Sequence, residues 1–403
     1  RNQLKLLLEE YTRLSDGKIE FNHLDPVIDK ARALEISNRY ERQIDQNCLF
    51  IEIQGKAKKL TETDLLDESG RFFTGEDAIT SAMLAVTEIK PKTVYLIAGK
   101  GKLKSVNNRS ADKELINLSK KQFFNLKELT LGNITKIPDD ADSLILINPE
   151  TDFNLSEVSI LTKYWEEKRG SMVLLLNPST DMPNFYPFLR SLGVRVDNEY
   201  RMLFSETTGI GGAQKVYTLQ SKILSANPIT SSDSGKITTF AGQTCPLSIA
   251  EDNEILSSKG IVATPLLEAD PKFWGDLNHT ESYPKQSDED ILPNPNPIYV
   301  AAMVEKGGSE DESIKVNSSR LVVVANSTLL DPMPTKLNVE FVMNSINWTI
   351  DRQDRIGINP THSTNFKINM SAEKYQTLFY LVVCIIPVSA LLFGIATWSA
   401  RRN

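Results

Sequence analysis

The sequence contains few of the residues on which metal, redox and acid–base chemistry usually depend, since only three cysteines and three histidines occur among 403 residues. No Cys-x-x-Cys pair is present, which excludes a thioredoxin-type dithiol centre. Cys48 and Cys245 allow a disulfide in an oxidising compartment, although two idle thiols are the favoured alternative. The histidines lie far apart, at His23, His279 and His362. No pair has the spacing of zinc ligands, and we expect neither a metal site nor another cofactor.

An excess of basic residues is also lacking. Lysine and arginine number 45 against 52 aspartates and glutamates, which gives a formal net charge of −7. A mildly acidic chain without a basic patch argues against a nucleic-acid partner. Hydrophobic residues make up 40% and charged residues 24%. This is the balance of an ordinary globular protein, and the chain is long enough for two or three domains.

One long uncharged stretch lies near the end of the chain. Residues 378–398 read LFYLVVCIIPVSALLFGIATW, and Arg401 and Arg402 follow them. At about 1.5 Å of rise per residue, such a helix crosses the roughly 30 Å hydrocarbon core of a bilayer. We therefore expect residues 366–403 to be a juxtamembrane segment and a transmembrane helix. Because long domains translocate largely regardless of flanking charge, we place residues 1–370 outside the cytoplasm and expect a signal or anchor segment before them.

The first block, residues 1–90, follows an α/β pattern. Apolar residues at a spacing of three and four predict a helix over 4–14, alternation predicts a strand over 19–24, and a second helix follows over 28–40. Two strands joined at Gln54-Gly55 and a last helix complete the block, at 49–53, 58–63 and 77–89. This order is that of the C-terminal half of a thioredoxin fold. We predict a thioredoxin-like domain without redox function.

The second domain, residues 91–365, is predicted to be a doubly wound α/β domain. Uniformly apolar strands alternate with helices, which is typical of a parallel sheet covered on both faces. The predicted strands lie at 93–98, 126–130, 142–147 and 172–176, and the predicted helices at 111–124, 155–168 and 184–192. We expect an irregular insertion around residues 221–297, with a solvated acidic loop at 270–297. Strands at 298–304 and 320–325 and a helix at 338–350 are expected to complete the sheet.

A glycine- and lysine-rich loop follows the first strand of this domain. Its residues offer backbone N–H groups and ammonium groups to a phosphate or carboxylate, and they are Gly99, Lys100, Gly101 and Lys102. The loop lacks the Gly-Lys-Ser/Thr ending of a nucleotide-hydrolysing P-loop. A plain solvated loop is the favoured alternative, so these residues are weak candidates for ligand binding.

An enzyme of the amidotransferase-like group, which this domain resembles, would place a nucleophile on the turn after residues 172–176. The turn contains Asn177, Pro178 and Ser179 in place of Gly-x-Ser-x-Gly. A base would have to come from His279 or His362, both in irregular segments. We therefore expect no catalytic residues, and a hydrolase or amidotransferase-like enzyme remains the less favoured alternative.

Five segments in a fixed order carry a family resemblance over nearly the whole chain. They are LLEEYTRLSDGKIEFNHLDP, FFTGEDAITSAMLAVTEIKPKTVYLIAGKGK, SRLVVVANSTLL, NVEFVMNSINWTIDR and the hydrophobic tail with its terminal arginines. This order resembles the GldG-like auxiliary proteins of ABC transporters, a family associated with gliding motility. Many relatives have Gly-His-Gly-Glu where this chain has Gly99 to Lys102. A site that depends on that histidine and glutamate would lack its titrating groups here.

The resemblance implies a function and a set of partners. It implies a non-catalytic accessory subunit that accompanies an ABC-2-type permease and its ATPase in the cytoplasmic (inner) membrane, with a large periplasmic domain for substrate or partner binding. The alternative is a structural scaffold that links a transporter to envelope components. Small residues of the tail helix would pack against permease helices as well as lipid, and they are Ser389, Ala390, Gly394 and Ala396.

Overall fold

The computed structural model describes residues 2–40, 47–53, 55–66, 73–87, 91–101, 105–106, 109–167, 169–208, 212–225, 227–251, 253–283, 285–307, 318–330 and 335–352. The predicted membrane helix at 378–398, its four small packing residues and Lys102 lie outside these ranges. Within them, no helix combines the length and the apolar character needed to cross a membrane.

The centre of the fold is a parallel sheet that agrees with the predicted strands. Its strands follow the spatial order β6-β3-β7-β8-β18, and each neighbouring pair is parallel. Their bounds are β3 Thr93–Ile97, β6 Asn125–Leu129, β7 Ser143–Ile147, β8 Ser171–Leu175 and β18 Ser319–Val324. Except at the edge strand β6, every residue of these strands is buried. This explains their uniformly apolar sequences and confirms the predicted α/β class.

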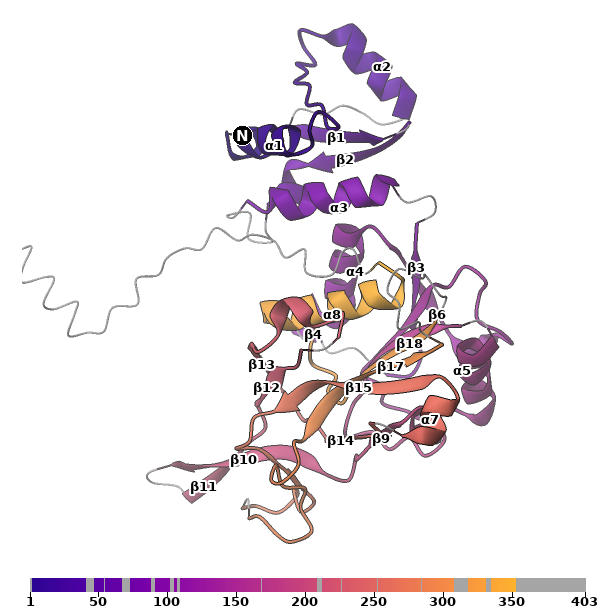
Figure 1. The fold of residues 1–403 in the computed structure, drawn as a ribbon, viewed down its shortest axis with the longest axis vertical. Helices are drawn as coiled ribbons and strands as arrows, with labels where there is room; N and C mark the ends of the chain where they lie inside the picture. Colours follow the sequence, from indigo (N-terminus) through magenta and orange to yellow (C-terminus); the bar gives the residue numbers. More distant parts are fainter. Residues whose placement is uncertain are drawn as a thin grey trace, which may run out of the picture. The chain divides into compact units, whose positions relative to one another are not determined.

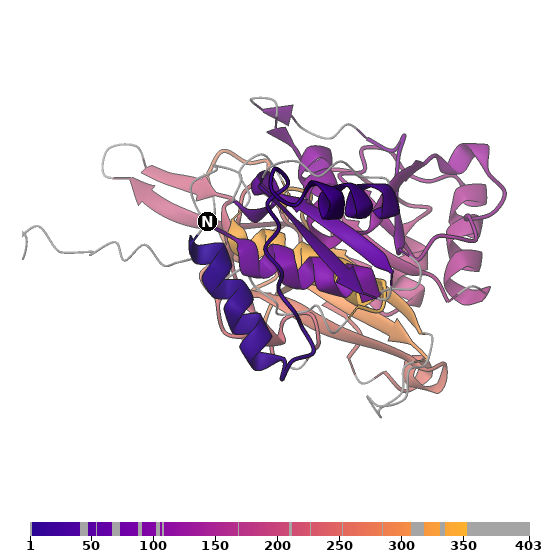
Figure 2. The same ribbon diagram turned by 90° about the horizontal axis from the view of Figure 1, so that it is seen from above.

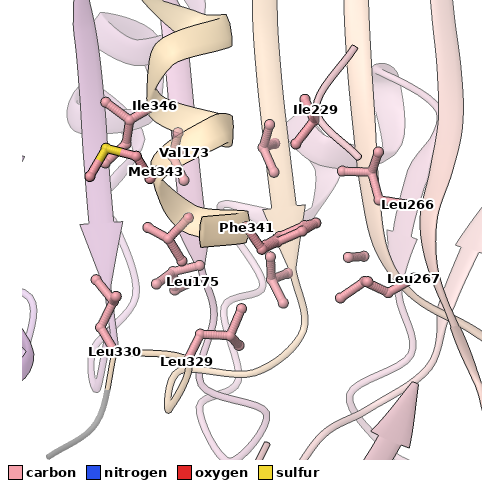
Figure 3. Packing of buried hydrophobic residues seen from close by; sticks show 14 of the residues in the cluster. Val173, Leu175, Ile229, Leu266, Leu267, Leu329, Leu330, Phe341, Met343 and Ile346 are labelled. Carbon is pink, nitrogen blue, oxygen red and sulfur yellow. The ribbon is translucent and has the colours of Figure 1, made fainter. Parts of the chain in front are cut away.

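Helices cover both faces of the parallel sheet. Leu115 of α4 (Ala111–Gln122) and Phe341 of α8 (Lys336–Thr349) belong to one core cluster. Trp165 of α5 (Leu155–Glu167) and Leu189 of α6 (Tyr186–Ser191) belong to another. In Figure 3, Phe341 lies above Leu175 of β8 within the first cluster. Burying a side chain of this size contributes roughly 1.5–3 kcal/mol, and such contacts fix the helices on the sheet.

An antiparallel half extends the sheet beyond β18, which the sequence interpretation did not foresee. β17 (Tyr299–Lys306), β15 (Ile261–Ala269), β12 (Leu219–Ile223) and β13 (Ile237–Phe240) follow in that order, each antiparallel to the next. Three of these strands lie in residues 219–269, so most of the region predicted as an irregular insertion is regular sheet. The predicted last strands and helix, now β17, β18 and α8, are confirmed.

Short elements connect the larger ones. β9 (Val194–Val196) and β14 (Leu247–Ile249) pair with each other at the margin of the sheet, and α7 (Glu254–Ser258) precedes β15. The remaining short elements are β4 (Ser105–Val106), β5 (Arg109–Ser110) and the 3₁₀ turns η1 (Glu62–Leu65), η2 (Leu131–Asn133) and η3 (Ser231–Asp233).

A separate three-stranded sheet carries a projecting hairpin. β10 (Arg201–Thr208) pairs with β11 (Gly212–Val216) on one side and with β16 (Trp274–Asp276) on the other. Figures 1 and 2 both show the β10–β11 hairpin projecting from the large sheet. Asp290 accepts hydrogen bonds from the backbone N–H groups of Leu277 and Ser287. The predicted solvated acidic loop is therefore organised around a carboxylate.

The first block contains the predicted helices and hairpin but not its first strand. Its elements are α1 (Asn2–Leu14), α2 (Lys30–Tyr40), β1 (Cys48–Ile53), β2 (Lys56–Thr61) and α3 (Gly75–Thr87). The predicted strand at 19–24 was wrong, because β1 and β2 form a sheet of two strands among the described residues. Phe21 still packs on the small core of this block. The alternating apolar pattern therefore reflects side-chain burial, although within the part of the chain that the structure describes the segment has no neighbouring strand with which to form backbone hydrogen bonds. A thioredoxin-like arrangement is therefore not shown.

Candidate functional site

The carboxyl ends of the parallel strands are the place where doubly wound folds bind ligands, at the point where the strand order reverses. Here that point lies between β3 and β7, since β6 continues from β3 on one side and β7 on the other. The loops that follow β3, β7 and β8 begin at Ala98, Asn148 and Leu176. These loops contain both the Gly99–Lys102 candidate and the turn that would hold a nucleophile.

The loop after β3 is bound tightly to the loop after β7. The carbonyl oxygen of Lys100 accepts hydrogen bonds from the backbone N–H groups of Glu150 at 2.7 Å and Thr151 at 3.0 Å. A Cβ atom on Gly101 would lie 2.4 Å from the carbonyl oxygen of Asn148, far inside van der Waals contact. Glycine is therefore required at position 101 by a close approach of two backbones, which explains part of the motif without a ligand.

The ammonium group of Lys100 is engaged within the protein. Its Nζ lies 2.5 Å from Oε2 of Glu157 and 3.1 Å from the carbonyl oxygen of Asp152. It also lies 4.8 Å from the centre of the Phe153 ring, within cation–π range. The side chains of Lys100 and Glu157 are only 13% and 7% exposed. This geometry favours a structural role for Lys100. The ammonium group that was predicted to bind an anion is paired with Glu157 instead.

The turn after β8 is held by its own side chains. The Asn177 side chain accepts from the backbone N–H of Ser179 at 3.0 Å, and the Ser179 hydroxyl donates to Oε1 of Gln243 at 2.9 Å. An amide oxygen cannot remove a proton from a hydroxyl group as an imidazole does. The Ser179 hydroxyl on the turn after β8 is therefore not activated by this partner.

Arg201 connects this turn to two neighbouring loops. Its guanidinium donates to Oε1 of Gln243 at 3.1 Å and to the carbonyl oxygens of Pro178, Asn198 and Tyr200 at 2.7, 2.6 and 2.8 Å. Arg201 is 6% exposed, and none of the ion pairs among the described residues includes it. Burial lowers the pKa of its guanidinium. A buried cation held by neutral oxygens is a structural clamp whose donors are nearly all used.

Cys245 lies beside this clamp and is fully buried. Burial raises the pKa of its thiol to about 12, and Tyr186 nearby also has a raised pKa because of burial. The thiolate is the nucleophilic form, so a cysteine in this environment is inert. Cys245 is a free thiol, so it forms no disulfide with Cys48 in this structure.

We predict that Cys245 of the native full-length protein does not react with iodoacetamide at pH 8. A pKa near 12, against an ordinary value of 9.0, lowers the thiolate fraction about a thousandfold. Peptide mass spectrometry should find Cys245 unmodified in the native protein and alkylated only after unfolding. Rapid alkylation of Cys245 before unfolding would show that this region opens.

A second polar cluster lies on the three-stranded sheet, where sequence analysis predicted nothing. The strand register places five side chains on one face of β11, β10 and β16 or directly beyond it: Arg201, Lys215, Tyr217, Trp274 and Asp276. Burial, followed by the nearby Asp290 charge, raises the pKa of Asp276. Burial and the Arg201 charge lower the pKa of His279. The run Ser287 to Asp290 was the only sequence signal nearby, and it pointed to a solvated loop.

Two further features of the described residues concern metal binding and cavities. No group of three His, Cys, Asp or Glu side chains in the described ranges is arranged to hold a metal ion. A pocket of about 240 Å³ lies at the start of β15, and Glu251 is the one ionisable residue in its lining. The strand register places this pocket at the opposite edge of the sheet from the loops described above.

Comparison with known proteins finds distant similarity of structure. The sequence matches no protein-family model and no curated protein. The mmIFT52 N-terminal domain is 12% identical and covers 64% of this chain and 97% of its own length, with a TM-score of 0.44. A putative ThuA-like protein from Bacteroides uniformis is 11% identical, covering 65% of this chain and 93% of its own, with a TM-score of 0.37. An exo-beta-1,4-mannosidase from Opitutaceae bacterium strain TAV5 is 12% identical, covering 71% and 41%, with a TM-score of 0.31. Similarities at this level do not identify a function.

Proposed function

We propose that this chain is a non-catalytic, membrane-anchored accessory subunit of an ABC-2-type transporter, whose α/β domain lies outside the cytoplasm and binds substrate or a partner near the permease. The five ordered sequence segments that resemble GldG-like auxiliary proteins are the basis of the proposal. In the same proposal, the α/β domain belongs to the amidotransferase-like group and the first block is a reduced thioredoxin-like unit. The hydrophobic segment 378–398 is the anchor.

The positions of the resembling segments in the fold support this proposal. The segment from Ser319 forms β18 and the segment from Asn338 forms most of α8. They bind each other through Arg320, which donates to the carbonyl oxygen of Trp348 at 2.7 Å and lies 5.2 Å from its ring. Because the two segments pack against each other in the core, we expect proteins that share this fold to contain both of them.

One observation carries the non-catalytic part of the proposal. The Ser179 hydroxyl, at the position of a nucleophile, donates to the Gln243 amide oxygen instead of to a base. The other candidates for chemistry are also engaged, since Lys100 is paired with Glu157 and Cys245 is sealed from solvent. The carboxyl edge of the sheet therefore supports a rigid platform better than an active site.

Exposed apolar side chains of the first block favour a protein partner, which fits both an accessory subunit and a scaffold. Val27 and Ile28 are 64% and 79% exposed, and Leu34 of α2 is 64% exposed. The Asp25 carboxylate accepts from the backbone N–H groups of both Val27 and Ile28, so a local turn holds these side chains outward. Apolar side chains fixed in solvent are typical of contact surfaces.

Co-purification of the full-length membrane complex tests the proposed function. Affinity capture of this chain from detergent-solubilised membranes should recover an ABC-2-type permease and an ATPase, identified by mass spectrometry. Recovery of neither, from membranes in which the three genes are expressed together, would contradict the proposal. Recovery of envelope proteins without a transporter would support the scaffold alternative.

A single change in the tail is expected to weaken that complex. Ala390 and Gly394 are four residues apart, so in the proposed helix both would lie on one face, where two helix backbones can approach closely. Gly394→Leu should reduce permease recovery about fivefold, which corresponds to about 1 kcal/mol, while leaving membrane insertion intact because leucine favours lipid. Unchanged recovery for both Gly394→Leu and a chain with an unrelated anchor would place assembly in the extracytoplasmic domain.

A further inference from the structure

The polar face of the three-stranded sheet is covered by a short segment, residues 277–283, which we call the strap. Lys215 of β11 donates from its Nζ to the carbonyl oxygens of His279 at 2.7 Å and Glu281 at 2.5 Å. The hydroxyl of Tyr217 donates to the same His279 carbonyl at 3.3 Å. The strap is thus fixed to the hairpin through its backbone, and its hydrogen bonds depend on the position of His279.

The start of the strap is fixed by two carboxylates. Asp276 accepts from the backbone N–H of Asn278 at 2.9 Å, and Asp290 accepts from that of Leu277 at 3.1 Å. The Lys215 ammonium lies 4.0 Å from Oδ2 of Asp276. The carboxylate of Asp276 is therefore both a cap for the strap and the partner charge of the lysine that holds it.

The His279 ring lies among buried charges. Arg201 of β10 and Asp276 of β16 are the charges that act on the ring, and Asp290 lies near Asp276. Lys215 of β11 and Tyr217, which directly follows β11, donate to the backbone carbonyl oxygen of His279. Nδ1 of His279 is buried without a hydrogen-bond partner. Two cations and two carboxylates balance each other here, so the closed strap accommodates a neutral imidazole. A proton on His279 would add a third cation to a poorly solvated cluster.

We propose that the strap is released by acid, with His279 as the proton acceptor whose charging opens the polar face of the β10–β11–β16 sheet. In the open strap the ring is solvated and titrates near the ordinary histidine value of about 6.5. In the closed strap, burial and the Arg201 charge lower the pKa of the ring by more than the Asp276 charge and hydrogen bonding to the backbone of Leu277 and Asp276 raise it. Protons therefore bind the open form preferentially, and closure weakens as pH falls below about 6.5.

Asp276 acts in the opposite direction at lower pH. Its pKa is raised in the closed strap, so the closed form takes up a proton on this carboxyl group more readily than the open form. This uptake begins above the ordinary aspartate pKa of 3.8 and offsets part of the histidine effect. Release of the strap is consequently largest at pH values below about 6.5 but above those at which Asp276 takes up its proton. Mildly acidic compartments or surfaces have a pH in this range.

Hydrogen–deuterium exchange of the full-length protein in nanodiscs tests the proposal. After correction for the intrinsic pH dependence of exchange, amides of residues 277–283 should exchange about threefold faster or more at pH 5.5 than at pH 7.5. Amides of β15 should not change and serve as the internal measure of folding. Exchange in the strap that is equal at the two pH values would overturn the proposal.

Variants separate His279 from the other titrating groups. His279→Gln should remove the pH dependence of strap exchange, and His279→Asn provides a second neutral side chain if the glutamine variant loses protection in β15. His23→Gln, which removes another of the three histidines, should leave the wild-type pH response. A full pH response in a folded His279 variant would assign the effect to another group and refute the role of His279.

Discussion

Replacing Arg201 with methionine should lower the free energy of unfolding by about 3–4 kcal/mol, the largest effect that we expect from one polar substitution in this chain. The guanidinium donates to one amide oxygen and three backbone carbonyl oxygens from three loops. Methionine has a similar volume but no donor, so it leaves these oxygens unpaired in a buried site. Urea unfolding of the full-length protein in detergent, followed by fluorescence, measures the loss.

Arg190 provides a matched control for this experiment. It lies in the last turn of α6 and is exposed, and none of the described side-chain hydrogen bonds includes it. Arg190→Met should change the free energy of unfolding by no more than about 0.5 kcal/mol. Equal effects of the two substitutions would show that the Arg201 hydrogen bonds do not act as a clamp.

The parallel half of the fold was predictable because its signals are local. Strands such as Ser143–Ile147 and Ser171–Leu175 are buried on both faces, and the sequence therefore shows an unbroken apolar run for each. The antiparallel half lacks that signal. Ser221 is fully buried in β12, and Pro265 lies beside a register shift in β15, so both strands read as irregular.

The predicted strand at 19–24 failed for a different reason. Alternating burial requires only one apolar neighbour, and Phe21 has one in the core of the first block. A strand also needs a second backbone within hydrogen-bonding distance, and β1 pairs only with β2 among the described strands. Whether two extended segments meet is a tertiary property that alternation does not encode.

The polar groups were the hardest to predict from the sequence. Most of the oxygens that surround Arg201 belong to backbone carbonyl groups, which any residue supplies, so no motif marks them. Lys100 and Glu157 are 57 positions apart and meet only because β3 and β7 are neighbours in the sheet. A lysine in a glycine-rich loop therefore has the same sequence signature whether it binds an anion or a buried glutamate.

Lys100→Met tests which of these two roles is correct. The substitution should lower the free energy of unfolding by about 3 kcal/mol, because it leaves the Glu157 carboxylate, 7% exposed, without its cation. Glu157→Gln should cost less, since an amide oxygen can still accept from the backbone N–H of Asn154, which lies 2.9 Å from the carboxylate. Chemical unfolding of the single and double variants gives the coupling between the two side chains.

The double variant decides the interpretation. If the pair is structural, losing both charges costs about 1–3 kcal/mol less than the sum of the two single changes. Lys136→Met is the control, because Lys136 and Asp139 form an exposed pair that should contribute at most about 1 kcal/mol. The opposite result would be additive costs for Lys100 and Glu157, unchanged stability of Lys100→Met and reduced recovery of the permease. That result would identify Lys100 as a binding residue. A large coupling energy between Lys100 and Glu157, with unchanged recovery of the permease, would establish that the glycine- and lysine-rich loop has a structural role. Lys100 then pairs with Glu157 of α5, and Gly101 packs against the backbone of the loop after β7.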